Sequence, residues 1–174
     1  MPDPQPASPL QLSRRHAPPP AGAGAEAEAA VLRLPLTAEE RTRLRGQRRT
    51  ACGRDLLLLL PRGGALEPGE WLAADDGVPQ VRVEAAPEPL LLVRAEAPLE
   101  LLRAAYHLGN RHVALEIRPG ELRLLEDPVL ADLLRQRGLD PQRCSEPFLP
   151  ESGAYAPGHA HAHAHAHAHA HEPG

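Results

Sequence analysis

The sequence contains no lysine, few aromatic residues and only two cysteines, and each shortage excludes a class of function. A phosphate-binding loop of the GxxxxGK[ST] type needs a lysine, so that class of nucleotide chemistry is excluded. Aromatic residues make up 2% of the chain and the formal net charge is −4, which does not favour a nucleic-acid binder. Cys52 and Cys144 are too far apart for a CxxC-type zinc or redox site. We expect two free thiols in a reducing cytosol, with a single disulfide as the alternative.

Long hydrophobic runs are also missing. No apolar stretch approaches the roughly 20 residues that span a bilayer, and the N-terminus lacks the apolar region of a signal peptide. We therefore expect a cytoplasmic protein that does not enter a membrane. Enzyme motifs are absent as well, since Ser145 and Ser152 stand in no nucleophile elbow and the acidic residues show no specific pairing.

The N-terminal part divides into two predicted segments. Residues 1–29 are rich in Pro, Ala and Gly without periodicity, which predicts a disordered leader. Residues 30–86 carry short apolar runs between turn signals, which predicts a small all-β domain with strands near 31–36, 56–60, 71–74 and 78–86. Thr37 to Glu40 resembles a helix capping box, but the alternation over residues 41–45 favours a strand there. The proline-rich residues 86–89 predict a linker.

The pattern changes in residues 89–150. A buried strand at 90–95 precedes a helix at 98–108, with Leu99, Leu102 and Tyr106 spaced as one apolar face and Gly109 as its left-handed cap. Strands at 113–117 and 121–125, a helix from Pro128 to about 138 and a strand near 144–149 complete the order β-α-β-β-α-β. This order predicts a ferredoxin-like domain and an α+β protein overall. Residues 151–174 predict a flexible tail.

Six arginines and no acidic residue lie between Arg41 and Arg54. Such a run fits an anion- or nucleic-acid-binding face, a solvated strand face, or a docking surface for a partner protein. The absence of interleaved aromatic residues argues against nucleic acid.

The tail carries the clearest chemical signal. The tail is rich in histidine. Imidazole suits Ni²⁺, Cu²⁺ and Zn²⁺, and most of the tail's histidine side chains are neutral near pH 7. Alternate residues of an extended chain lie about 6.6–6.8 Å apart, so the tail must bend around an ion, which favours capacity and fast exchange. An expression tag and a slipped repeat are the alternatives. Seven histidines alternate with alanine: His159, His161, His163, His165, His167, His169 and His171.

His112 follows the predicted helix at the start of an apolar stretch. A lone histidine there is more often structural, and one imidazole cannot hold a divalent ion. In a two-fold dimer with His112 near the axis, however, symmetry presents this ligand twice, and tail histidines complete the shell.

The motif Tyr-His-Leu-Gly-Asn-Arg-His at 106–112, followed by a terminal histidine run, resembles the UreE family of urease accessory nickel metallochaperones. The resemblance covers about residues 31–171, and its other matching stretches are 44–55, 60–70, 130–138, 146–148 and 152–155. It implies a β domain joined to a ferredoxin-like metal-binding domain, and a homodimer in which His112 of each subunit binds one Ni²⁺. It further implies that tail histidines bind more metal, and that nickel reaches the urease apoprotein complex through the accessory GTPase.

One departure from the family separates this sequence from some members. They carry His-x-His at the positions filled here by Glu126, Asp127 and Pro128, so a peripheral metal site is not expected there. A nickel or zinc storage protein remains the alternative function, and an adaptor with an incidental tail is a third. A pure buffer needs no folded histidine at a dimer interface, which favours the chaperone.

Overall fold

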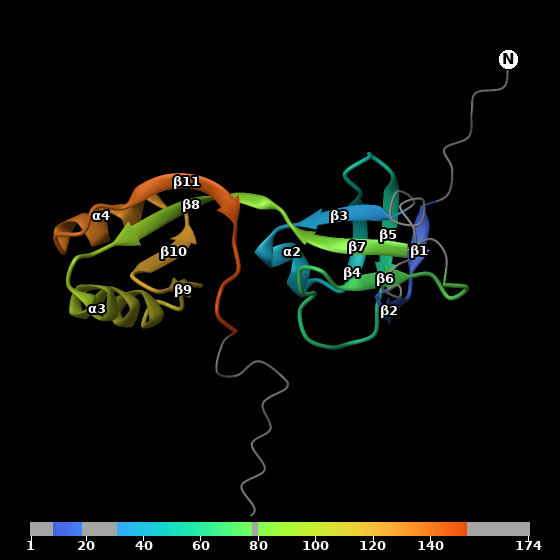
Figure 1. The fold of residues 1–174 in the computed structure, drawn as a ribbon, viewed down its shortest axis with the longest axis horizontal. Coiled ribbons are helices and arrows are strands. Elements are labelled where there is room, and N and C mark those ends of the chain that lie inside the picture. Colours follow the sequence, from blue (N-terminus) through green and yellow to red (C-terminus); the bar gives the residue numbers. More distant parts are fainter. Residues whose placement is uncertain (1–8, 19–30, 78–79, 153–174) are drawn as a thin grey trace, which may run out of the picture.

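The computed structural model describes residues 9–18, 31–77 and 80–152. Two units lie side by side in Figure 1, joined where β7 runs into β8. No helix in these ranges is long and apolar enough to cross a membrane. The mixed α+β class predicted from the sequence is confirmed.

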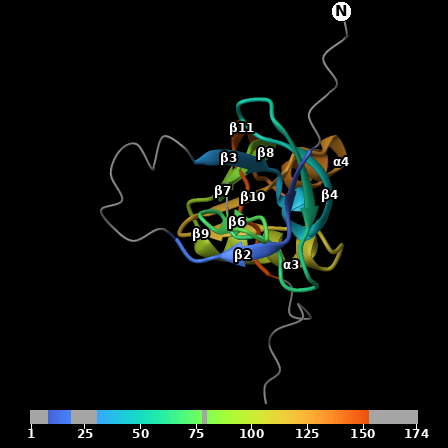
Figure 2. The ribbon, with the colours of Figure 1, turned by 90° about the vertical axis from the view of Figure 1, so that its right-hand side faces the viewer.

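The N-terminal unit is built mainly of short strands. These form a three-stranded sheet of order β1-β5-β4 and a four-stranded sheet of order β2-β6-β7-β3. Figure 2 views the molecule from the end at which this unit lies, and β3 and β4 are on opposite sides of the unit. The elements are β1 (Leu10–Leu12), β2 (Arg14–His16), β3 (Leu32–Leu36), α2 (Ala38–Thr42), β4 (Arg45–Arg49), β5 (Asp55–Leu59), β6 (Trp71–Ala73) and β7 (Gln80–Ala85).

The core of this unit is made almost entirely of leucine and valine. Alternate residues of the strands point inward, which is the period that a sheet with one buried face requires. The buried cluster comprises Leu12, Leu34, Leu36, Leu56, Leu58, Leu60, Leu66, Leu72, Val81 and Val83. Branched aliphatic side chains therefore fill this core in place of aromatic ones.

The prediction of a disordered leader over residues 1–29 is wrong where the structure describes it. Leu10 to Leu12 pair in parallel with Leu56 to Leu58, and Leu12 is fully buried. Arg14 to His16 form a second strand beside β6. The Leu-Gln-Leu alternation is too short to signal a strand, because its partner β5 lies more than 40 residues away. The rest of the predicted leader, 1–8 and 19–29, lies outside the described residues.

The strand preferred for residues 41–45 is also wrong at its start, because the capping box nucleates a helix instead. The Thr37 hydroxyl accepts from the Glu40 backbone N–H at 3.2 Å, and the Glu40 carboxylate accepts from the Thr37 N–H at 2.9 Å. These two reciprocal bonds satisfy amides that a helix N-terminus otherwise leaves unpaired. The result is α2, after which β4 begins at Arg45.

The C-terminal unit follows without a linker. Its sheet has the order β11-β8-β10-β9, with every neighbouring pair antiparallel. Pro87 and Pro89, expected in a linker, lie in β8 beyond the residues that pair with β10, where a missing N–H is tolerated. The elements are β8 (Pro87–Arg94), α3 (Pro98–Gly109), β9 (Glu116–Arg118), β10 (Glu121–Leu125), α4 (Pro128–Gln136) and β11 (Gln142–Pro147).

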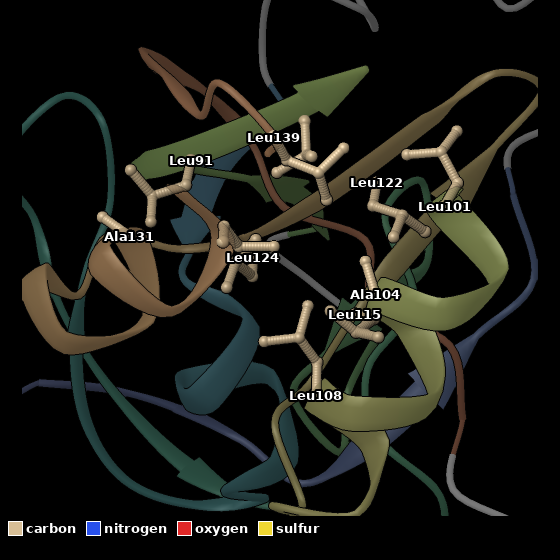
Figure 3. Packing of buried hydrophobic residues seen from close by; sticks show 11 residues of the cluster. Leu91, Leu101, Ala104, Leu108, Leu115, Leu122, Leu124, Ala131 and Leu139 are labelled. Atoms are coloured by element: carbon tan, nitrogen blue, oxygen red, sulfur yellow. The ribbon is translucent and has the colours of Figure 1, made fainter. Parts of the chain in front are cut away.

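Helices α3 and α4 pack on one face of this sheet. Figure 3 shows Leu101, Ala104 and Leu108 of α3 directed toward Leu122 and Leu124 of β10. Helix α4 contributes Ala131 and Leu134 to the same cluster, and its N-terminus is capped by the Asp127 carboxylate. This core fixes the orientation of α3 and hence the place where its last turn ends.

Buried hydrogen bonds connect the two units. The Arg41 side chain is 5% exposed, and its Nη2 donates to the Phe148 carbonyl at 2.7 Å. In the other direction, Oε1 of the buried Glu88 accepts from the Ala38 N–H at 2.7 Å, at the start of α2. Each contact joins a charged group of one unit to a backbone group of the other, so the units are held by directional bonds.

A second buried charge network lies within the C-terminal sheet. Arg123 of β10 is 5% exposed and pairs with both Glu121 and Glu146, while Arg94 donates to Glu121 at 2.6 Å. Burial alone would raise the pKa of Glu121, but the hydrogen bonds and charges of Arg123 and Arg94 outweigh it and lower the pKa below its usual value. The carboxylate therefore stays ionised to a lower pH than an ordinary glutamate.

This network predicts a defined acid dependence of stability. Because the pKa of Glu121 is lower in the folded than in the unfolded chain, its contribution is present above the ordinary pKa of 4.5 and is lost as pH falls through the folded value. We expect Glu121→Gln to lower the free energy of unfolding by about 1–3 kcal/mol near neutral pH. Below pH 4.5 its stability should fall less steeply than that of the parent protein. Urea titrations across this pH range measure both effects.

Glu39→Gln is the matched control, because Glu39 pairs with Arg43 on the exposed surface. This variant should keep the parent's stability to within about 0.5 kcal/mol, as well as its acid dependence. An equal effect of the two substitutions would contradict the assignment to the buried network.

Candidate metal centre

The chain leaves α3 through a closely defined turn. The Val113 N–H donates to the Leu108 carbonyl at 3.2 Å, and the His112 N–H donates to the Gly109 carbonyl at 2.8 Å. These nested bonds are those of a Schellman motif, which satisfies the last carbonyls of a helix and requires a left-handed residue at the position after the cap. That residue is His112, with φ of 57°.

This arrangement corrects two predictions. Gly109, predicted as the left-handed cap, is the last residue of α3, and the left-handed position comes three residues later. The strand predicted to begin at Val113 begins at Glu116 instead, because the Val113 N–H still closes the turn and pairing with β10 starts only at Glu116.

His112 is the one non-glycine residue with positive φ among those that the structure describes. The left-handed conformation costs an L-residue about 1–2 kcal/mol, and glycine normally occupies this position of the motif. The imidazole is exposed to solvent and lies outside the hydrophobic core. A histidine that neither packs nor suits its backbone conformation points to a role outside folding.

Nearby ligands are few in the described part of the chain. No cluster of three or more His, Cys, Asp or Glu side chains there could hold a metal ion. His107 lies one turn earlier, with its ring edge-on to Tyr106 at a centroid distance of 5.3 Å. Desolvation and the positive charges of Arg137 and Arg111 lower the pKa of His107 below 6.5, so its imidazole is neutral near pH 7. The single His112 needs ligands from elsewhere to form a site.

The outer face of α3 is apolar and exposed. Leu99, Leu102 and Tyr106 are 53%, 66% and 66% exposed, although their spacing predicted the buried face of the helix. The buried positions are instead Leu101, Ala104 and Leu108, which have the same i, i+3, i+7 spacing. Helix α3 therefore carries two apolar stripes, one in the core and one on the surface that leads toward His112.

The end of the chain also approaches this turn. After β11, residues 148–152 pass down between the two units in Figure 1. We call this stretch the crossing segment. The Leu149 N–H donates to Oε2 of the buried Glu116 at 2.9 Å, and the Glu151 N–H donates to the Leu115 carbonyl at 2.7 Å.

These bonds place the start of the tail beside the turn. Leu115 is only three residues from His112, so Glu151 is held close to the candidate ligand. The seven predicted tail ligands, His159 to His171, lie outside the described residues. Neither Arg41 nor Glu116 was singled out from the sequence as an anchor, since nothing in their local pattern indicates their distant partners.

Comparison with known proteins matches nearly the whole described chain to one family. Residues 12–86 match the N-terminal domain of the UreE urease accessory protein, and residues 88–172 match its C-terminal domain. The chain belongs to the UreE urease accessory protein family.

Curated relatives are similar over most of the chain. The urease accessory protein UreE of Parasynechococcus marenigrum is 60% identical over 130 residues, which cover 75% of this chain and 86% of the relative. The protein of that name from Synechococcus sp. strain WH7805 is 61% identical over 131 residues, covering 74% and 75%. The corresponding protein of Synechococcus sp. strain CC9311 is 59% identical over 126 residues, covering 72% and 81%. The chain is therefore an accessory protein and not an enzyme.

The strained backbone at His112 can be tested through stability. We expect His112→Gly to raise the free energy of unfolding of the metal-free protein by about 1 kcal/mol, because glycine relieves the left-handed conformation. Chemical denaturation at one fixed protein concentration measures the change. His107→Gly is the matched control and should lose roughly 0.5 kcal/mol, because residue 107 is helical and glycine has a lower helix propensity than histidine. A loss of stability in His112→Gly would show that His112 is retained for folding.

Proposed function

We propose that this chain is a nickel chaperone for urease maturation that binds Ni²⁺ through His112 at a dimer interface and through the histidines of its tail. The observation that carries the proposal is the left-handed backbone of His112. A surface histidine at a position that suits glycine reduces stability. A role as a metal ligand explains why a histidine is nevertheless present there. Membership of a urease accessory family supplies the destination of the metal.

Dimerisation follows from the ligand count. One imidazole cannot hold a divalent ion, whereas a two-fold axis beside His112 brings two imidazoles to the same ion. The exposed stripe of Leu99, Leu102 and Tyr106 on α3 offers an apolar surface for such an interface. The strand order β11-β8-β10-β9 with two helices on one face accords with a ferredoxin-like metal-binding domain over residues 89–150. The β unit over residues 30–86 is then the region that docks on partners.

The tail supplies further ligands. His159 follows Glu151 by eight residues, a stretch that spans about 26–29 Å when extended. Leu115, which anchors Glu151, is within about 10 Å of His112 along the chain. His159 and the later histidines can therefore reach His112 of the same subunit or of its partner. An ion held partly by such ligands exchanges readily, which suits delivery.

The proposed partners are a second copy of this chain, the urease accessory GTPase and the urease apoprotein complex. The free thiols of Cys52 and Cys144 accord with a reducing cytoplasm. Ni²⁺ is the proposed cargo, although histidine ligands also accept Zn²⁺ and Cu²⁺. Selection of nickel then depends on geometry, supply and partner recognition, because copper binds nitrogen ligands more tightly.

The two kinds of metal site are separable by titration. We expect calorimetry with Ni²⁺ to find one tight site per dimer, which His112→Ala abolishes while most tail capacity remains. Deleting residues 158–174 should lower the stoichiometry and retain the tight site, and light scattering should report the mass of each species. If the titration finds no more than weak, tail-dependent binding to a monomer, the result favours the storage alternative and contradicts the delivery mechanism.

The proposed interface is testable by mutation on α3. We expect Leu102→Glu to weaken dimerisation by at least about 100-fold, because symmetry introduces the charge twice into an apolar contact. Analytical ultracentrifugation across a dilution series measures the change. Val129→Glu, on the exposed surface of α4, is the matched control and should leave the dimer intact. Equal weakening by both variants would place the interface elsewhere.

A further inference from the structure

A cleft with a strongly basic rim opens in the N-terminal unit, away from His112. It encloses about 960 Å³ and lies between the end of α2, the start of β4 and the loop after β5. No carboxylate is among its lining residues, which are Thr42, Arg43, Leu44, Arg45, Leu60, Arg62 and Gly63. The side chains of all three lining arginines are exposed.

The charge of this rim is only partly neutralised. Arg43 pairs with Glu39 on α2. Arg45 directs its Nε to the Leu60 carbonyl at 3.3 Å, and neither Arg45 nor Arg62 has an ion-pair partner among the described residues. Elsewhere in this unit Arg15, Arg33 and Arg49 each face a carboxylate. The cleft is therefore a local excess of positive charge in a chain whose formal net charge is −4.

Other hydrogen bonds hold the walls in place. Arg48 Nη2 donates to the carbonyls of Glu40 and Arg43 at 3.4 and 3.2 Å, which fixes the turn that carries Arg43 and Leu44. On the opposite side, Arg15 donates to the Gly64 carbonyl and pairs with Glu70 at 2.8 Å, which fixes the loop that carries Arg62. The cleft is thus preformed by bonds that do not use its own free cations.

We propose that this cleft binds an acidic segment of a partner protein in which carboxylates alternate with aliphatic side chains. Guanidinium groups recognise carboxylates by paired hydrogen bonds, and Leu44 with the arginine stems supplies apolar contact. The volume is at the upper end of the roughly 300–1,000 Å³ of small-molecule pockets, so it accommodates several peptide residues. No aromatic side chain lines the cleft for base stacking, which disfavours single-stranded nucleic acid. This inference rests on the proposed function, because it gives the chemistry of the segment that the β unit would dock.

The test uses the full-length, nickel-free protein and a short fluorescent peptide of alternating glutamate and leucine. We expect saturable binding that weakens with added salt, and a rise in Kd of about tenfold for Arg45→Glu and again for Arg62→Glu. Arg62→Gln should show a smaller rise and covers the event that the charge reversal unfolds the unit. Arg82→Glu is the matched control, because Arg82 is exposed on β7 and does not line the cleft.

The outcomes decide between occupants. Equal weakening by Arg82→Glu, or no saturable binding by the parent protein, would overturn the proposal. Tighter binding of inorganic phosphate or of a single-stranded oligonucleotide, with the same sensitivity to Arg62→Glu, would replace the acidic peptide by a general anion site. Nickel titration of the same variants separates this result from the chaperone hypothesis, since neither Arg45 nor Arg62 contacts the region of His112.

Discussion

The hydrogen bond from the buried Arg41 guanidinium to the Phe148 carbonyl ties the two units of this protein together at one point. Arg41 belongs to a five-residue helix of the first unit, and Phe148 follows the last strand of the second. Phe148 is fully buried, and so is the hydrogen bond that its carbonyl accepts. Loss of the guanidinium would leave a buried acceptor unpaired, which is costly. This contact therefore fixes both the packing of the units and the direction in which the chain leaves β11.

That direction determines what the rest of the chain can do. From Phe148 the crossing segment reaches the Glu116 carboxylate and the Leu115 carbonyl, which lie immediately after the turn of His112. Two features far apart in sequence, a strained histidine at residue 112 and a tail that begins after residue 151, are in this way brought to one place. In the proposed function the roles are separate: the folded turn fixes one ligand in space, and the histidines of the tail sequence supply further ligands.

The sequence predicts this structure where the signal is local. The bounds of β10 and the start of α4 at Asp127-Pro128 agree with the structure, because turn residues and a side-chain cap define them nearby. The buried stripe of α3 could not be chosen, since Leu99/Leu102/Tyr106 and Leu101/Ala104/Leu108 have identical spacing. Only the position of the sheet decides which stripe is inside. The strand at Leu10 to Leu12 depends on β5, and the role of Arg41 depends on a carbonyl 107 residues away.

At the candidate site, too, local sequence preference fails to predict the backbone conformation. The motif around residues 106–112 identifies His112 as a candidate ligand, but local preference would place the left-handed residue at Gly109. Helix α3 instead ends at Gly109, and the left-handed residue of the turn that follows is a histidine, against the usual preference of this motif. A glycine at position 112 would favour folding more than the histidine does. The histidine therefore meets a requirement of the proposed site and not of the fold. In the proposed mechanism the same choice limits affinity, because each subunit offers a single rigid imidazole. In this proposal the tight site exists only while two subunits hold the ion between them, and separating the subunits releases it.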